Sequence, residues 1–217
     1  MKALIFDMDG VIIDSERFYN QKDRAWFAQQ GIRVDWKEFY KTMGTTSRTM
    51  QEKLREWNPD ADFDALMKKH HEFWKQQVVD YRLLFRPAVC DLISQCRTYH
   101  IKTALASSSS MKNIMQVVDQ CGLQGCFDVI LSGEDLENSK PDPAIFLLCA
   151  EKLQVDCSDC VVIEDSTNGV IAGKRAGMVV IGLTDPYFDL DLSEADSLTD
   201  SLSSLEVVMD RIYIKKA

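Results

Sequence analysis

The sequence predicts an α/β protein, in which a small helical domain is inserted into a doubly wound parallel sheet. Three observations support this fold class. An apolar run at residues 3–6 ends in aspartates, residues 15–82 show helical periodicity without a convincing strand, and short apolar strands alternate with helices after residue 87. We therefore expect an α/β core built from residues 1–14 and 83–217, and a helical domain at 15–82.

The first strand is expected at residues 3–6, where four apolar residues follow one another. This run is too short for a helix and too uniformly apolar for a half-exposed strand, so we expect it to be buried on both faces. Asp7 and Asp9 follow at its carboxyl end, where open α/β sheets bind ligands, and Gly10 permits a sharp turn. Two such carboxylates can bind a hard cation, or one can act as a nucleophile while the other transfers a proton. The alternative is that Asp9 and Gly10 form an ordinary turn.

The inserted segment is expected to be helical because apolar residues recur there at helical spacing between charged ones. The first helix begins after Asp14 and is stopped by Gly31, and Gly44 and Asn58-Pro59 interrupt the later pattern. The expected helices span residues 15–31, 35–43, 47–57 and 64–79. A block of helices between strand-rich segments is typical of a separate small domain.

The remainder of the chain alternates between strands and helices, which predicts parallel strands joined by helical crossovers. Asp142 is expected to cap a helix whose first residue is Pro143. The expected strands span residues 102–106, 128–131, 160–163 and 179–183, with a last short one near 196–198. The expected helices span residues 88–99, 110–121, 143–153, 169–176 and 201–212.

The composition is that of a globular protein of 217 residues, 46% of them hydrophobic, which can bury a substantial core. The net charge of -9 argues against nucleic acids and anionic membranes as partners, because both favour clustered Lys and Arg. We expect a cytoplasmic location, since neither a membrane span nor a signal-peptide pattern is found. We also expect a monomer. The seven cysteines are expected to be reduced; Cys157 and Cys160 have a spacing that a zinc or redox site can use, but no second close pair accompanies them.

Polar residues also follow three later strands of the predicted sheet. Ser107 opens a run of serines that leads into a helix, where hydroxyls and free backbone amides can hold phosphate; a plain helix cap is the alternative. Lys140 lies in a polar loop, where a solvated lysine is the alternative. Glu164 and Asp165 end a buried strand, and adjacent carboxylates there require a cation or a positive partner. We expect these groups to meet Asp7 at one edge of the sheet.

Taken together, these groups resemble the four motifs of the haloacid dehalogenase (HAD) superfamily, and the resemblance covers the whole chain. The motifs are Asp7-x-Asp9-Gly10, Ser107, Lys140 and Glu164-Asp165. The segments at 139–143 and 163–169, with a helical insert after the first motif, are similar to the β-phosphoglucomutase and small sugar-phosphate phosphatase branch.

The resemblance implies a Mg²⁺-dependent phosphatase that acts on a small phosphorylated metabolite, such as a sugar phosphate. Asp7 would attack phosphorus to form an aspartyl-phosphate, and Asp9 would protonate the leaving oxygen and then deprotonate water. Ser107 and Lys140 would hold the phosphoryl oxygens. A β-phosphoglucomutase, which transfers the phosphoryl group to a second position, is the alternative; a binding module without catalysis is a third possibility.

The metal ligands are also implied by the resemblance. Mg²⁺ would bind a carboxylate oxygen of Asp7, the backbone carbonyl of Asp9 and the carboxylate of Asp165. Glu164 would support the ion through water.

The helical insert resembles a mobile cap that closes over the site and selects the substrate. Arg48 follows a loop similar to one that, in β-phosphoglucomutases, supplies an arginine to the non-reacting phosphate, although the spacing here is one residue longer. Tyr19 stands where the mutases carry a histidine, which favours the phosphatase. A mutase lysine falls near Lys69 and His70, and a solvated helix face is the alternative for Arg48 and Lys69. The expected substrate-binding residues are Ser107, Ser108, Lys140, Arg48, Tyr19 and Thr45.

Overall fold

The computed structural model describes residues 1–215, and its centre is a six-stranded parallel sheet with the strand order β3-β2-β1-β4-β5-β6. The strands are β1 (Ala3–Phe6), β2 (Lys102–Ser107), β3 (Val129–Ser132), β4 (Cys160–Glu164), β5 (Val179–Leu183) and β6 (Ser197–Thr199). Every ladder between neighbouring strands is parallel. The predicted fold class, a doubly wound parallel sheet, is confirmed.

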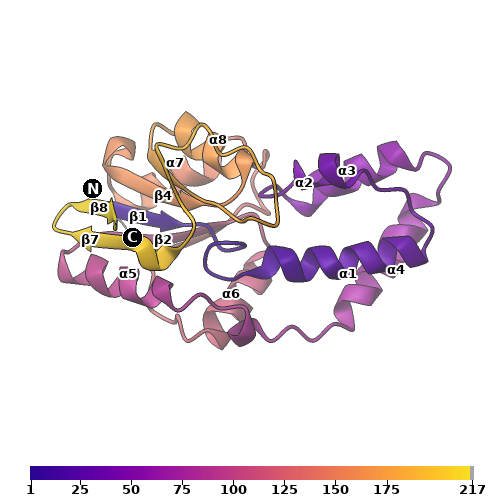
Figure 1. Ribbon diagram of the computed structural model, residues 1–217, viewed down its shortest axis with the longest axis horizontal. Helices are drawn as coiled ribbons and strands as arrows, with labels where there is room; N and C mark the ends of the chain where they lie inside the picture. The colour runs from indigo at the N-terminus through magenta and orange to yellow at the C-terminus, as the bar shows by residue number, and fades with distance from the viewer. Residues whose placement is uncertain (216–217) are drawn as a thin grey trace.

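Helices cover both faces of this sheet (Figure 1). They are α5 (Ala88–Thr98), α6 (Met111–Gln120), α7 (Ala144–Leu153) and α8 (Thr167–Arg175). Leu4 and Phe6 of β1 belong to the hydrophobic cluster under α5 and α6, whereas Ala3 and Ile5 belong to the cluster under α7 and α8. Because side chains alternate across a strand, a strand that is buried on both faces must be apolar throughout.

The register of the central strands determines where the polar motifs meet. Phe6, the last residue of β1, pairs with Leu105 of β2 on one side and with Ile163 of β4 on the other. The backbone N–H of Asp7 donates to the Ile163 carbonyl at 3.1 Å, which continues the ladder by one residue. The carboxyl ends of β1, β2 and β4 therefore lie side by side.

A helical block lies beside the carboxyl edge of the sheet and extends away from it (Figure 1). It consists of α1 (Ser15–Gln29), α2 (Trp36–Tyr40), α3 (Ser47–Trp57) and α4 (Phe63–Lys75). The block has its own hydrophobic cluster, centred on Trp26, Phe27, Leu54 and Leu66. No helix within residues 1–215 has the length and apolar character needed to cross a bilayer.

The predicted helix at residues 201–212 is wrong. After the short 3₁₀ turn η3 (Leu202–Ser204), the chain forms an antiparallel hairpin of β7 (Leu205–Val208) and β8 (Arg211–Ile214). Leu205 and Val207 are buried and alternate with exposed neighbours, which is the period of a strand. Met209, with φ of 57°, supplies the left-handed turn between the two strands.

The start of α7 also differs from the prediction by one position. Pro143 is the N-cap residue, and the helix begins at Ala144. The carboxylate of Asp142 accepts a hydrogen bond from the Ala144 N–H at 2.9 Å, so it still satisfies one free donor at the helix start. Two further 3₁₀ turns are η1 (Tyr81–Leu83) and η2 (Cys157–Asp159).

Candidate active site

Lys140 lies at the centre of the polar groups that end the central strands. Its Nζ atom is 2.5 Å from Oδ1 of Asp7 and 2.6 Å from Oε1 of Glu164, and the residue is 2% exposed. The ammonium also lies 5.0 Å from the ring centroid of Phe146 on α7. Charge-assisted hydrogen bonds of this kind hold donor and acceptors in a fixed geometry. Lys140 is therefore a buried partner of the Asp7 carboxylate, and the solvated-loop alternative is excluded.

Glu164 is held in place from its other side. Its Oε2 atom accepts hydrogen bonds from the N–H groups of Asp165 and Ser166, both at 3.0 Å, and from the Ser166 hydroxyl at 2.9 Å. Gly169 lies so close that an added Cβ atom would be 1.8 Å from Oε1 of Glu164. Both oxygens of Glu164 thus have protein partners, and the carboxylate orients Lys140.

Asp9 accepts two hydroxyl donors. Ser15 donates to Oδ1 at 2.7 Å, and Ser109 donates to Oδ2 at 2.9 Å. The Ser109 N–H in turn donates to Oγ of Ser107 at 3.0 Å. Neither Ser15 nor Ser109 was among the residues expected from sequence. Ser109 belongs to the serine run that was noted, and Ser15 opens the first helix, but neither position by itself indicates a contact with Asp9.

The glycine after Asp9 brings a further carboxylate to this turn. Gly10 has φ of +80°, and a Cβ atom there would lie 1.8 Å from Oδ2 of Asp165. The site therefore brings together the carboxylates of Asp7, Asp9, Glu164 and Asp165, and Lys140 pairs with two of them, those of Asp7 and Glu164. A buried excess of negative charge is costly without a cation.

The ionisation of these groups reflects that excess. Burial raises the pKa of Asp7 well above its ordinary value, although the Lys140 charge opposes the shift. Burial and the nearby Glu164 charge also raise the pKa of Asp165. Burial raises the pKa of Asp9, while its hydrogen bonds from Ser15 and Ser109 work in the opposite direction. A divalent cation bound beside these carboxylates would stabilise their charged form and so lower the raised pKa values.

The donor set is compatible with Mg²⁺, which prefers oxygen ligands and keeps several waters. Among residues 1–215, no group of three or more His, Cys, Asp or Glu side chains is arranged to hold a metal ion. The expected set does not require such a group, because it combines two carboxylates with the backbone carbonyl of Asp9. The assignment of these ligands stays a prediction.

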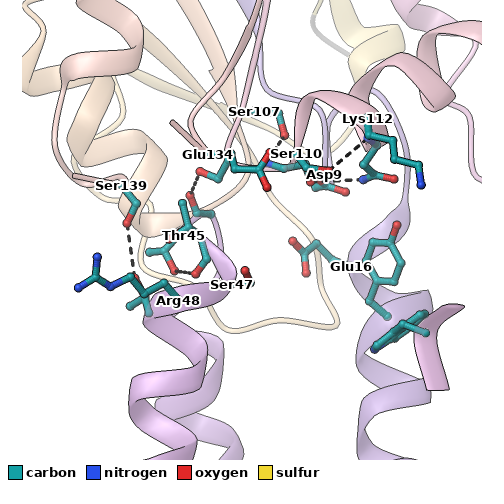
Figure 2. A pocket seen from close by; sticks show the side chains of 18 of the residues that line it. Asp9, Glu16, Thr45, Ser47, Arg48, Ser107, Ser110, Lys112, Glu134 and Ser139 are labelled. Atoms are coloured by element: carbon teal, nitrogen blue, oxygen red, sulfur yellow. Dashed lines mark hydrogen bonds between the residues drawn. The ribbon is translucent and has the colours of Figure 1, made fainter. Parts of the chain in front are cut away.

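A cavity of about 1200 Å³ lies between the core and the helical block, and Figure 2 shows side chains from both sides projecting into it. The expected site residues among its lining are Asp7, Asp9, Ser107, Ser108, Tyr19, Thr45 and Arg48. Arg48 is exposed and forms an ion pair with Glu52, with 3.2 Å between Nε and Oε1. Lys69 is exposed and is not part of the lining, whereas His70 is buried inside the helical block against Asp23.

Glu16 is a cavity residue that the sequence analysis did not identify. It lies one residue into α1, is half-buried, and points into the space between the two sides of the cavity (Figure 2). Burial and the charges of Asp9 and Asp7 raise its pKa to about 8. Its position directly after Asp14 and Ser15, near the start of the first helix, was the only sequence signal for it.

Comparisons with known proteins agree with the motif resemblance. Residues 4–183 match the family described as haloacid dehalogenase-like hydrolase. A phosphorylated carbohydrates phosphatase of Thermotoga maritima is 34% identical over 178 residues, which cover 82% of each protein. Hexitol phosphatase B of Escherichia coli is 31% identical over 91% of this chain and 93% of its own length.

The fold is shared with solved structures of the same kind. A β-phosphoglucomutase from Clostridium difficile matches with a TM-score of 0.78 and 25% identity, over 95% of this chain and 93% of that one. The match to the family model extends from β1 to the end of β5 and so includes every strand that ends at the candidate site. The chain belongs to the haloacid dehalogenase-like hydrolase family.

Proposed function

We propose that this protein is a Mg²⁺-dependent phosphatase that removes the phosphoryl group from a small phosphorylated carbohydrate by way of an aspartyl-phosphate. The observation that carries the proposal is the Asp7 carboxylate, held by Lys140 at the wall of the cavity, with Asp9 beside it. The relatives named as carbohydrate and hexitol phosphatases support the substrate class.

In the first step, the Asp7 carboxylate attacks phosphorus, a new O–P bond forms, and the bond to the leaving oxygen breaks. Asp9 gives its proton to that oxygen, so that the leaving group departs as a neutral alcohol. In the second step, Asp9 takes a proton from water, which attacks phosphorus and releases Asp7. Because Lys140 pairs with Oδ1 of Asp7, the lysine holds the nucleophile in one orientation.

The negative charge of the phosphoryl group also has to be neutralised. Ser107 and Lys140 would hold the phosphoryl oxygens, in keeping with their place at the ends of β2 and before α7. Mg²⁺, bound by Asp7, the carbonyl of Asp9 and Asp165, would offset the charge repulsion between carboxylate and phosphate. Glu164 would support this arrangement through Lys140 and, as expected from the family resemblance, through water at the metal.

We further propose that residues 15–82 form a cap domain and that residues 1–14 and 83–217 form the catalytic core. The separate hydrophobic cluster of the helical block supports this division, and hydrogen bonds seat the block on the core. The Ser108 hydroxyl donates to the Gly44 carbonyl at 2.8 Å, and the Asn168 amide donates to the Met43 carbonyl at 2.9 Å. A cap seated in this way excludes water and brings Tyr19, Thr45 and Arg48 to the substrate.

A panel of sugar phosphates, assayed with Mg²⁺ for phosphate release, tests the proposal. We expect at least one member to be hydrolysed by the wild-type protein and none by the Asp7→Asn variant, because an amide is a poor nucleophile. Absence of phosphate release from every member would overturn the proposed function.

A β-phosphoglucomutase remains the second candidate, and the structural match to such an enzyme favours it. Tyr19 in the position of the mutase histidine argues for the phosphatase. A coupled assay with β-glucose 1-phosphate separates the two: glucose 6-phosphate formed faster than free phosphate would establish the mutase.

A further inference from the structure

We propose that Tyr19, Tyr81 and Asn113 are positioning residues that aim the Ser109 hydroxyl at Asp9 and connect it to the helical block. The inference rests on the proposed function in one respect, the role of Asp9 as proton carrier. It gives Tyr19, Tyr81 and Asn113 a role that the mechanism above does not assign to them.

The four side chains form a continuous hydrogen-bonded chain along the cavity wall. The hydroxyl oxygens of Tyr19 and Tyr81 are 3.0 Å apart, and the Tyr81 hydroxyl donates to Oδ1 of Asn113 at 2.6 Å. Nδ2 of Asn113 donates to Oγ of Ser109 at 3.4 Å, and Ser109 donates to Oδ2 of Asp9 at 2.9 Å. The chain therefore ends on the carboxylate that is to move the proton.

The chemistry of these groups gives the chain a single direction. Oδ1 of Asn113 has no hydrogen, so the Tyr81 hydrogen points to Asn113, and Tyr19 must be the donor to Tyr81. Nδ2 of Asn113 only donates, so Ser109 accepts there and its one hydrogen is left for Asp9. Every hydrogen in the chain thus points toward Asp9, and donors aligned in this way polarise one another.

The hydrogen bonds between these side chains also join segments that connect the core to the helical block. Tyr19 lies on α1, Tyr81 lies in η1 on the returning connection, and Asn113 lies in the first turn of α6. Tyr81 is only 4% exposed, and its N–H donates to Oε1 of Gln120 at 2.8 Å. Tyr19 packs edge-on against Trp74 of α4, with ring centroids 5.2 Å apart. A change in the position of the helical block would therefore move the groups that orient the Ser109 hydroxyl.

Loss of these hydrogen bonds is expected to slow proton transfer from Asp9 more than it weakens substrate binding. Without the Asn113 donor, the Ser109 hydrogen is free to turn away, and Asp9 keeps only the Ser15 donor as a fixed partner. A carboxyl group that is misplaced by a fraction of an ångström still lets substrate bind, but it meets the leaving oxygen less often.

The experiment compares two substrates in the Tyr81→Phe variant, which loses the hydroxyl and keeps the ring. One substrate is the best sugar phosphate of the panel, whose alcohol must be protonated; the other is p-nitrophenyl phosphate, whose leaving group departs without a proton. Leaving-group release is followed in the first turnover, before water attacks the phosphorylated Asp7, because Asp9 serves both substrates alike in that second step. We expect the first-turnover rate for the sugar phosphate to fall about tenfold with little change in substrate binding, and the rate for p-nitrophenyl phosphate to stay within about twofold of wild type. The second substrate also reports that the variant is folded.

Two further variants sharpen the comparison. Asn113→Ala removes the next link and is expected to reproduce the same split between substrates. Tyr40→Phe is the matched control, because its hydroxyl bonds Arg24 and Asn20 inside the helical block and lies outside the chain. It should leave both activities unchanged.

The Asp9→Asn variant separates failure of this inference from failure of the proposed function. If Asp9→Asn selectively slows first-turnover release from the sugar phosphate, but Tyr81→Phe matches wild type or slows release from both substrates alike, the positioning role is overturned and the role of Asp9 stands. If Asp9→Asn changes first-turnover release from the two substrates alike, the role of Asp9 as proton donor to the leaving group fails and the inference fails with it.

Discussion

At the scale of single residues, burial gives Lys140 its role. The residue is 2% exposed, and its ammonium pairs with the buried carboxylates of Asp7 and Glu164. In such a cluster, removal of one charge leaves the others uncompensated, which costs more than the pair itself contributes. The same lysine in a solvated loop would contribute little.

Lys140→Met should therefore lower the free energy of unfolding by about 3–5 kcal/mol and abolish phosphatase activity, because two buried carboxylates lose their partner. Urea unfolding of the metal-free protein measures the first effect. Lys174→Met is the matched control: Lys174 pairs with Asp196 at the surface, and its loss should cost at most about 1 kcal/mol. Equal losses in the two variants would contradict the account.

Glu16 gives a prediction about pH. Its pKa is raised from an ordinary 4.5 to about 8, so the folded state holds a proton that the unfolded state has released between these values. The folded protein binds more protons there, and the contribution of Glu16 to stability is present at low pH and is lost as pH rises toward 8.

As the pH rises from about 4.5 to about 8, the melting temperature of the wild type should therefore fall relative to that of Glu16→Gln. Melting curves of the metal-free proteins would measure it. The exposed Glu206→Gln variant is the control and should show no such trend. A wild type that gains stability over Glu16→Gln with rising pH would contradict the assignment.

At the scale of elements, the contact between the helical block and the core depends on the loop that ends at Gly44. This glycine has φ of +76°, and an added Cβ atom would lie 2.0 Å from Oγ of Ser166, at the start of α8. The loop can therefore seat on the core only because it lacks a side chain at this position.

Gly44→Ala should keep the helical block from seating and lower kcat/KM by about tenfold or more, since a misplaced cap no longer completes the site. Gly31→Ala is a closely matched control: it has φ of +67° and so carries similar backbone strain, but nothing lies within 4 Å of its Cβ position. Steady-state kinetics and melting temperatures of both variants make the test. A similar loss of activity in both would attribute the effect to backbone strain alone.

The same scale shows where prediction from sequence failed. β1 was predictable because all four of its residues are apolar, and a run this short and this apolar is typical of a strand buried on both faces. Around β7, the spacing of Leu202, Leu205 and Met209 fits a helix, while that of Leu205 and Val207 fits a strand. The choice is made by tertiary contacts, such as the Val207 N–H that donates to Oε1 of Gln95 on α5 at 2.6 Å.

At the scale of the whole molecule, the site is assembled by the strand order. β2, β1 and β4 are neighbours in the sheet although the segments are far apart in sequence, and their carboxyl ends bring Ser107, Asp7 and Glu164 together. That convergence was predictable, because parallel strands share one edge for their carboxyl ends. The contacts of Ser15, Ser109 and Glu16 were not, because they depend on side-chain directions in the assembled fold.

The central claim is that Asp7 carries the phosphoryl group, and trapping of that group tests it most directly. Protein mixed with its best sugar phosphate and Mg²⁺ is quenched during turnover and treated with borohydride, which reduces an aspartyl-phosphate to homoserine. Peptide mass spectrometry should find the conversion at position 7 in wild type, and none there in Asp7→Asn. Phosphate release with no modified residue, or with the modification at another aspartate, would contradict the account.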